Sequence, residues 1–91
     1  MQTEQKQAFI YQANGEIIPI TPKNNVSFTL KEMQDIVGGY IEIVYLKDGR
    51  IMVVNEEGKF NDLNPNQEAT KLYMNDYIVG DVLVTPKNFV K

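Results

Sequence analysis

The sequence predicts an α+β domain in which one mostly antiparallel sheet carries two packed helices, in the order ββαββαβ. Short runs of β-branched and aromatic residues are separated by tight-turn dipeptides, the pattern of antiparallel hairpins. Two other segments place apolar residues three and four positions apart behind capping residues, the pattern of short helices. With 91 residues, the chain has room for one core. We therefore expect a disordered tail over residues 1–6 and a single α+β domain over residues 7–91.

A β-hairpin is predicted at the start of the domain. Residues 8–12 favour a strand, and Asn14-Gly15 follows as a two-residue turn. Residues 16–20 are the expected partner strand. Because Pro19 has no backbone N–H to give to a neighbouring strand, residues 16–20 are expected at a sheet edge or in a bulge.

The first helix is predicted to follow Thr29. Thr29 and Glu32 have the spacing of a capping box, in which the threonine caps the helix and the glutamate reaches back. Gly38-Gly39 is expected to end the helix, because glycine accepts the left-handed conformation at a helix C-terminus. The predicted buried face consists of Leu30, Met33, Ile36 and Val37.

A second hairpin is predicted from residues 40–46 and 51–54, joined by a tight turn at 47–50. Both strands carry apolar residues on much of both faces. Two-sided burial is typical of strands inside a sheet, so both strands are expected at central positions.

The second helix is predicted to begin with Asn64 as cap, Pro65 in the first helical position and Gln67 completing the box. A last strand is expected over residues 77–84, bent at Gly80-Asp81. The buried stripe of the helix is expected to be Ala69, Leu72 and Tyr73.

The composition excludes several kinds of catalytic centre. The chain has no histidine and no cysteine, which removes serine–histidine triads, thiol nucleophiles, thiolate metal sites and histidine-based metal centres. Asp62, Asn64 and Asn66 alternate as at the start of a calcium loop, but Gln67 and Tyr73 stand where that pattern requires glycine and glutamate. We therefore expect no metal, no cofactor and no enzymatic activity.

The charge pattern limits the partners. Nine basic residues stand against twelve acidic ones, a net charge of −3. The basic residues are spread along the chain, whereas a nucleic-acid-binding protein gathers them on one face, so no nucleic-acid partner is expected. The polar N-terminus and the short apolar runs predict no membrane contact. A cytoplasmic location is the resulting expectation.

The most polar stretch between regular elements, residues 55–68, is the candidate functional surface. A structural interpretation makes its first part a solvated turn, in which Gly58 takes a positive φ and Asn55 bonds local backbone. A chemical interpretation makes Glu56 or Glu57 a base, although adjacent side chains normally point in different directions. The candidate interaction or ligand residues are Asn55, Glu56, Glu57, Asn66 and Glu68.

The chain also resembles a known family through the sequence GGYIE at 38–42, NEEG at 55–58, then Leu63, Asn66, Ala69 and Gly80-Asp81. It is similar to a bacterial, phage and mobile-element domain of unknown function. The resemblance implies a small accessory protein and brings no established activity. The residues that match the family's motif positions are Asn55, Glu56, Glu57, Gly58, Leu63, Asn66 and Ala69.

A structural role for this motif is a polar clasp between the second helix and the preceding turn. Asn66 lies where its amide is expected to tie back to the turn at 55–58. Leu63 and Ala69 are then expected to pack beneath it, and Gly58 to permit the chain reversal.

Three functions remain open at the level of sequence. The first is a protein-interaction module that binds an unidentified protein or a second copy of itself, through the 55–68 surface or through the strand edge that carries Pro19. The second is a small-ligand binder or carboxylate-based enzyme, with Asn55 and Asn66 orienting the ligand. The third is a weak acidic decoy that mimics DNA, for which a net charge of −3 is small.

Overall fold

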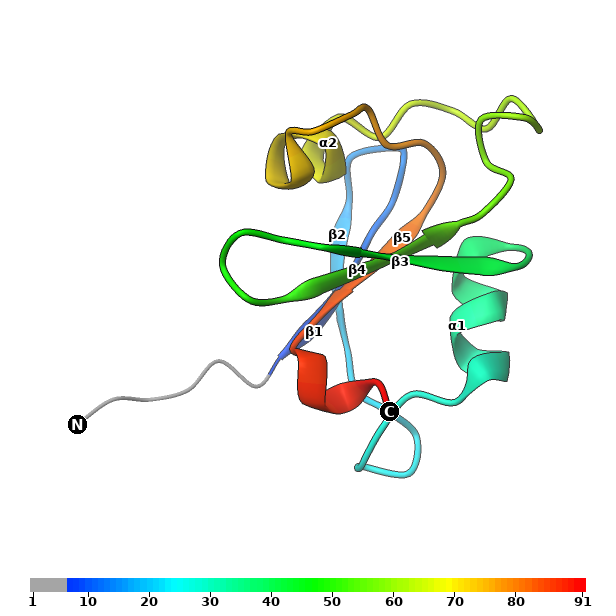
Figure 1. The fold of residues 1–91 in the computed structure, drawn as a ribbon. Helices are drawn as coiled ribbons and strands as arrows, with labels where there is room; N and C mark the ends of the chain where they lie inside the picture. The colour runs from blue at the N-terminus through cyan, green and yellow to red at the C-terminus, as the bar shows by residue number, and fades with distance from the viewer. Residues whose placement is uncertain (1–6) are drawn as a thin grey trace.

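The structure is a computed structural model that describes residues 7–91, so the tail predicted at 1–6 lies outside the described residues. The ββαββαβ order and the α+β class are confirmed (Figure 1). The elements are β1 (Ala8–Tyr11), β2 (Ile17–Ile20), α1 (Leu30–Val37), β3 (Ile41–Tyr45), β4 (Ile51–Asn55), α2 (Gln67–Tyr73), β5 (Val82–Thr85) and the short 3-10 helix η1 (Lys87–Phe89).

The five strands form one antiparallel sheet in the order β2-β1-β5-β4-β3. β2 is an edge strand, as Pro19 predicted. β3 is the other edge strand, so its predicted central position was wrong. The last strand, β5, enters between β1 and β4 and takes the central place. The apolar residues on both faces of β3 reflect partial cover by the helix layers, and the sequence of β3 itself does not show which strand lies beside it.

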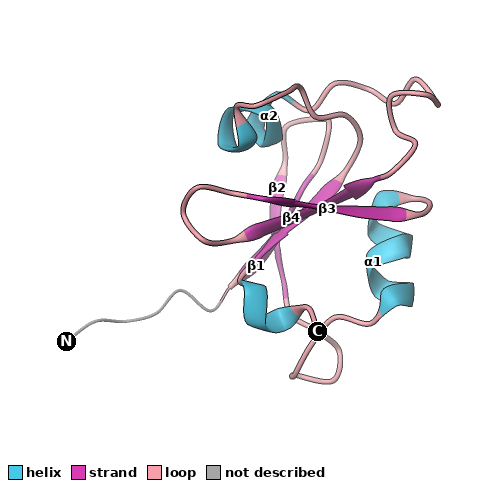
Figure 2. Cartoon of the chain, viewed as in Figure 1, coloured by secondary structure: helices cyan, strands magenta, loops and turns pink. Residues whose placement is uncertain are grey.

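The two helices pack on opposite faces of the sheet (Figure 2). On the α1 face, Met33 and Val37 join Val53 of β4 and Leu83 of β5 in one buried cluster. On the α2 face, a second cluster gathers Leu46, Met52, Val54, Ala69, Ile78, Val82 and Val84. Successive residues of β4 and β5 alternate between the clusters, as strand geometry requires. None of the described helices is long and apolar enough to cross a membrane.

Helix α1 confirms its predicted caps. The Thr29 hydroxyl accepts from the Glu32 N–H at 3.1 Å, the Thr29 N–H donates to the Glu32 carboxylate at 2.7 Å, and Gly38 ends the helix at φ 82°. Leu30 was predicted to be buried but is 56% exposed. The short connection after Val37 holds the last turn of α1 next to β3, whereas its first turn lies farther from that strand (Figure 1).

Helix α2 begins two residues later than predicted. Its N-cap is Asn66, whose side chain accepts from the Ala69 N–H at 3.1 Å. The assignment of Asn64 as cap was wrong because residues 64–66 pair with the backbone just before β5: Asn64 accepts from Gly80, and Asn66 donates to Ile78. Correspondingly, the strand predicted over 77–84 begins only at Val82.

The capping box predicts a pH dependence of stability. Backbone N–H groups of Thr29 and Lys23 donate to the Glu32 carboxylate and hold its pKa below the usual 4.5. A lowered pKa in the folded state stabilises the fold above pH 4.5, and this contribution is lost as the pH falls through the folded-state pKa. Glu32→Gln should therefore lose less stability between about pH 5 and pH 3 than the wild type, as measured by urea unfolding.

Thr29→Ala is the matched control for this prediction. It removes the threonine side-chain cap, which costs about 1 kcal/mol, but leaves both N–H donors on the Glu32 carboxylate. Its loss of stability on acidification should stay much closer to that of the wild type than that of Glu32→Gln, because the two backbone donors lower the pKa of Glu32 more than the Thr29 side chain does. An identical acid response in Glu32→Gln and wild type would contradict the prediction.

Candidate functional site

Asn55, at the end of β4, has a structural role on both sides of its amide. The side-chain Oδ1 of Asn55 accepts a hydrogen bond from the Glu57 N–H at 2.8 Å, and its side-chain NH₂ group donates to the backbone carbonyl of Val37 at 3.1 Å. The predicted bond to local backbone is thereby confirmed. The second bond, to the end of α1, fixes the start of loop 56–66 relative to that helix.

Gly58 is required for space and not for a positive φ. Its φ is not in the left-handed region, so that prediction was wrong. A Cβ at Gly58 would lie 2.8 Å from the Cγ2 of Val79 and 3.3 Å from the Asn55 carbonyl oxygen. Leu63 packs in the same place, since its Cδ1 would lie 3.5 Å from that Cβ.

Asn66 forms a clasp, but with partners other than those predicted. The side chain is 1% exposed, and its NH₂ group donates to the carbonyls of Tyr11 and Gly80, both at 2.8 Å. The clasp therefore joins the start of α2 to the end of β1 and the approach to β5. The predicted tie to the turn at 55–58 was wrong. Because this amide is buried and bonded, it is not available to orient a ligand.

The other candidate residues separate in space. Glu56 and Glu57 are both exposed but line different hollows. Glu68 forms an ion pair with Lys71 on the outer side of α2 and lines neither hollow. Ala69 is fully buried in the core beneath α2, as expected for the motif. Asn55 lies between the two hollows and lines both, so the structure pairs it with Glu56 at one hollow and with Glu57 at the other.

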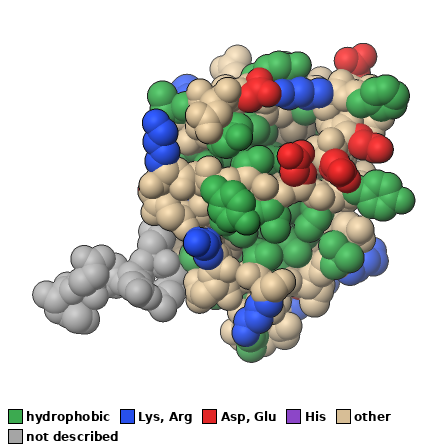
Figure 3. Space-filling view, in the orientation of Figure 1, with side chains coloured by type: hydrophobic (Ala, Val, Ile, Leu, Met, Phe, Trp, Pro, Cys, Tyr) green, Lys and Arg blue, Asp and Glu red, His purple; other side chains and the backbone are tan. Residues whose placement is uncertain are grey.

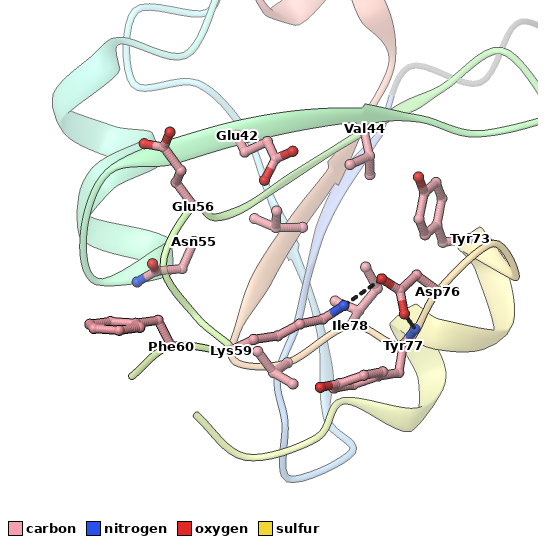
Figure 4. Close-up of a pocket in the computed structure, with 12 residues that line it drawn as sticks. Glu42, Val44, Asn55, Glu56, Lys59, Phe60, Tyr73, Asp76, Tyr77 and Ile78 are labelled. Atoms are coloured by element: carbon pink, nitrogen blue, oxygen red, sulfur yellow. Dashed lines mark hydrogen bonds and ion pairs between the residues drawn. The ribbon is translucent and has the colours of Figure 1, made fainter. Parts of the chain in front are cut away.

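That hollow, which we call the β3 hollow, has a volume of about 200 Å³ and lies on the α2 side of the sheet (Figure 4). Its sides come from loop 56–66 and from the chain that follows α2. Apolar residues of β3, β4 and the segment before β5 line it as well. It is lined by Glu42, Val44, Val54, Asn55, Glu56, Lys59, Phe60, Tyr73, Asp76, Tyr77, Ile78 and Val79.

The rim of the β3 hollow is acidic. Lys59 is hydrogen-bonded to Asp76, and its ammonium lies 4.0 Å from the centroid of the Tyr77 ring. The bond raises the pKa of Lys59 and lowers that of Asp76. Within residues 7–91, the Glu42 and Glu56 carboxylates have neither a hydrogen-bond nor an ion-pair partner, which leaves the rim with more negative than positive charge (Figure 4).

Exposed aromatic side chains line the same hollow as these carboxylates. Phe60 is 88% exposed and Tyr77 54% exposed. Figure 3 shows acidic side chains gathered next to apolar ones on this side of the molecule. Aromatic faces and carboxylates together attract a cation such as a lysine or arginine side chain. Among the described residues, no group of three or more acidic side chains is close enough to hold a metal ion.

Sequence reasoning missed most residues of the β3 hollow. Glu42 looked like one polar position in an apolar strand, and Lys59 and Phe60 lay in a stretch without a recognisable pattern. Tyr77 lay within the predicted last strand. Two signals were available: Glu42 is the only charge in β3, and Phe60 is an aromatic residue inside a polar loop. Neither signal indicates that these residues meet.

Comparisons with known proteins give one match, to a protein-family model. No curated protein and no solved structure matches the chain significantly. A family model described as a domain of unknown function (DUF3846) matches residues 10–88, which include all five strands except the first two residues of β1. The chain therefore belongs to this family of domains of unknown function.

Proposed function

We propose that the chain is a protein-interaction module without catalytic activity, and that its contact surface is the β3 hollow with its exposed aromatic rim. The observation that carries this proposal is the placement of Phe60, 88% exposed, in the same hollow as the Glu42 and Glu56 carboxylates, which have no partner among residues 7–91. Exposed aromatic residues in a polar rim are typical of the surfaces that anchor a partner.

The size of the β3 hollow supports a protein partner over a small-molecule ligand. Its volume of about 200 Å³ lies below the roughly 300–1,000 Å³ of sites that enclose a drug-sized molecule. A hollow of this size accommodates one or two side chains of a partner. The surface beyond it, which includes Phe60 and Tyr77, then supplies further contact area.

The alternative of a carboxylate-based enzyme or ligand binder has less support. Glu56 and Glu57 line different hollows, and the Asn66 amide is buried in its own hydrogen bonds. An acidic decoy for DNA-binding proteins is supported only by the few carboxylates at the β3 hollow, which is little charge for a DNA mimic.

The proposal extends to the setting of the protein. The resemblance of residues 38–42 and 55–58 to a bacterial, phage and mobile-element domain supports an accessory role in such an element. The absence of a basic face and of long apolar runs in the sequence supports a cytoplasmic partner.

The test compares two variants that change adjacent glutamates. Glu56→Ala combined with Phe60→Ala removes one carboxylate and one aromatic ring from the β3 hollow, whereas Glu57→Ala changes the neighbouring hollow. Captured proteins from a bacterial lysate are quantified by mass spectrometry, and each candidate partner is then titrated in purified form. The double variant should weaken binding at least about tenfold, the loss of a typical hot spot.

Glu57→Ala should bind like the wild type. All three changed side chains are exposed, so thermal unfolding should show little change in any variant. If every purified partner binds the double variant as tightly as the wild type, the β3 hollow is not the contact surface.

A further inference from the structure

Among residues 7–91, β2 and β3 are the two edges of the sheet, and they differ in what they offer to another strand. Two backbone hydrogen bonds at the ends of β3 show which of its residues bond to β4: one runs from the Glu56 N–H to the Tyr40 carbonyl, and the other from the Leu46 N–H to the Arg50 carbonyl. Backbone groups of even-numbered residues point toward β4. Those of Ile41, Ile43 and Tyr45 therefore point away from the sheet, with all their N–H donors present.

The β2 edge is blunted. The bond from Gln12 N–H to the Glu16 carbonyl directs the even-numbered residues of β2 toward β1. Ile17 and Pro19 therefore face outward, and Pro19 has no N–H to donate. The β2 edge, which the sequence analysis named as a possible docking edge, is therefore the poorer of the two. β3 contains neither proline nor lysine, the residues that discourage pairing at a sheet edge.

The β3 edge and the β3 hollow form one continuous surface. Glu42 and Val44 line the hollow on the α2 side, while Ile41 and Ile43 face the α1 cluster. A strand added to β3 would place alternate side chains directly opposite Glu42 and Val44, at the mouth of the hollow. A basic side chain opposite Glu42 would form the favourable cross-strand charge pair that Glu42 lacks among the described residues.

Charge also disfavours a second copy of this chain as the occupant. Two β3 strands paired antiparallel about Ile43 would place the two Glu42 side chains on the same face, in diagonal positions roughly 7–8 Å apart. A partner strand with lysine or arginine at those positions replaces this repulsion with attraction. The acidic rim therefore selects against self-pairing and for a cationic segment.

We infer that β3 is the docking edge for an extended lysine- or arginine-bearing segment of a partner protein, which joins the sheet next to β3 and directs a basic side chain to Glu42 and Glu56. This inference rests on the proposed interaction function and adds the mode of binding and the chemistry of the partner. Backbone hydrogen bonds to Ile41, Ile43 and Tyr45 would supply affinity, and the β3 hollow would supply specificity.

The experiment is a selection from a library of random displayed peptides against the full chain. Enriched peptides should alternate basic residues with β-branched ones, and their affinities are then measured by fluorescence anisotropy. Tyr45→Pro removes one outward N–H at a position whose side chain is 68% exposed, and should weaken binding about tenfold. Tyr45→Thr keeps the N–H and should retain most of the affinity.

A second pair of variants tests the charge contact without altering the backbone. Glu42→Gln should weaken the selected peptides by about two- to fivefold, as expected for a cross-strand charge pair. Glu57→Gln removes a carboxylate outside the β3 hollow and should have no such effect. These variants give an answer even if Tyr45→Pro unfolds.

The outcomes separate the inference from the proposed function. Peptides that lose affinity for Glu56→Ala/Phe60→Ala but bind Tyr45→Pro and Glu42→Gln normally would support the contact surface and overturn strand addition. Failure to enrich any peptide, or enrichment without basic residues, would also overturn the inference. If the wild type sediments as a dimer and Tyr45→Pro as a monomer, a second copy of the chain occupies β3. That result would overturn the inference that a segment of a different protein binds there.

Discussion

Asn66→Ala should lower the free energy of unfolding by about 3 kcal/mol, because it removes three hydrogen bonds in the core at once. The variant removes the hydrogen bonds that the Asn66 NH₂ group donates to the Tyr11 and Gly80 carbonyls, and it removes the N-cap bond to Ala69. For a domain of this size the melting temperature should fall by about 15 °C. Differential scanning calorimetry, with urea unfolding for the free energy, provides the measurement.

Two controls separate the clasp from ordinary capping. Asn66→Asp keeps an acceptor for the Ala69 N–H but replaces the two donors with an oxygen that faces the Tyr11 and Gly80 carbonyls, so it should be at least as destabilising as Asn66→Ala. Asn64→Ala changes an exposed side chain whose backbone carbonyl still accepts from Gly80, and should change stability by less than about 0.5 kcal/mol. Equal effects of Asn64→Ala and Asn66→Ala would refute the clasp.

Gly58→Ala should lower the free energy of unfolding by about 2 kcal/mol, because the new methyl group would overlap Val79. A Cβ at this position would lie 2.8 Å from the Val79 Cγ2, and valine has little rotameric freedom with which to move aside. The same Cβ would also lie 3.3 Å from the backbone carbonyl oxygen of Asn55, which is a tight contact with the main chain. The expected fall in melting temperature is about 10 °C.

A second substitution at Gly58 distinguishes a requirement for space from a requirement for a positive φ. If Gly58 were needed for a positive φ, Gly58→Asn would be tolerated better than Gly58→Ala, because asparagine accepts the left-handed region. If space is the requirement, the larger asparagine should be the more destabilising of the two. In a double-mutant cycle, Val79→Ala should reduce the cost of Gly58→Ala, and strict additivity would argue against a direct clash.

The structure also explains why the β3 hollow exists. Helix α2 has seven residues and ends at Met74, which adopts a left-handed conformation at φ 68°. The chain then turns back through Asp76 and Tyr77 toward β5. A helix this short does not extend over β3, so Glu42 and Val44 remain at the open side of the hollow (Figure 4).

Much of the fold could be predicted because its signals are local. The two hairpin turns, the capping box at Thr29, the stop at Gly38 and the edge position of β2 each depend on the conformational preferences of a few adjacent residues. The start of α2 could not be predicted from such signals, because Asn64 and Asn66 are both good caps. Pairing of residues 64–66 with the backbone at 78–80 decides between them.

The candidate site was less predictable than the fold. Sequence proximity grouped Glu56 with Glu57, whereas the turn directs them into different hollows, and it made Asn66 a surface residue that the structure buries. The β3 hollow combines side chains from β3, loop 56–66 and the chain after α2. No spacing within one segment carries that information.

The sequence by itself determined the element types, their order, their main caps and turns, and the absence of histidine and cysteine chemistry. These properties follow from composition and from preferences that act over a few residues. Only the tertiary structure decided that β5 lies between β1 and β4, which makes β3 an open edge and places Glu42 beside Glu56. Strand order depends on how the whole chain buries its apolar surface, and that balance involves residues distant in sequence.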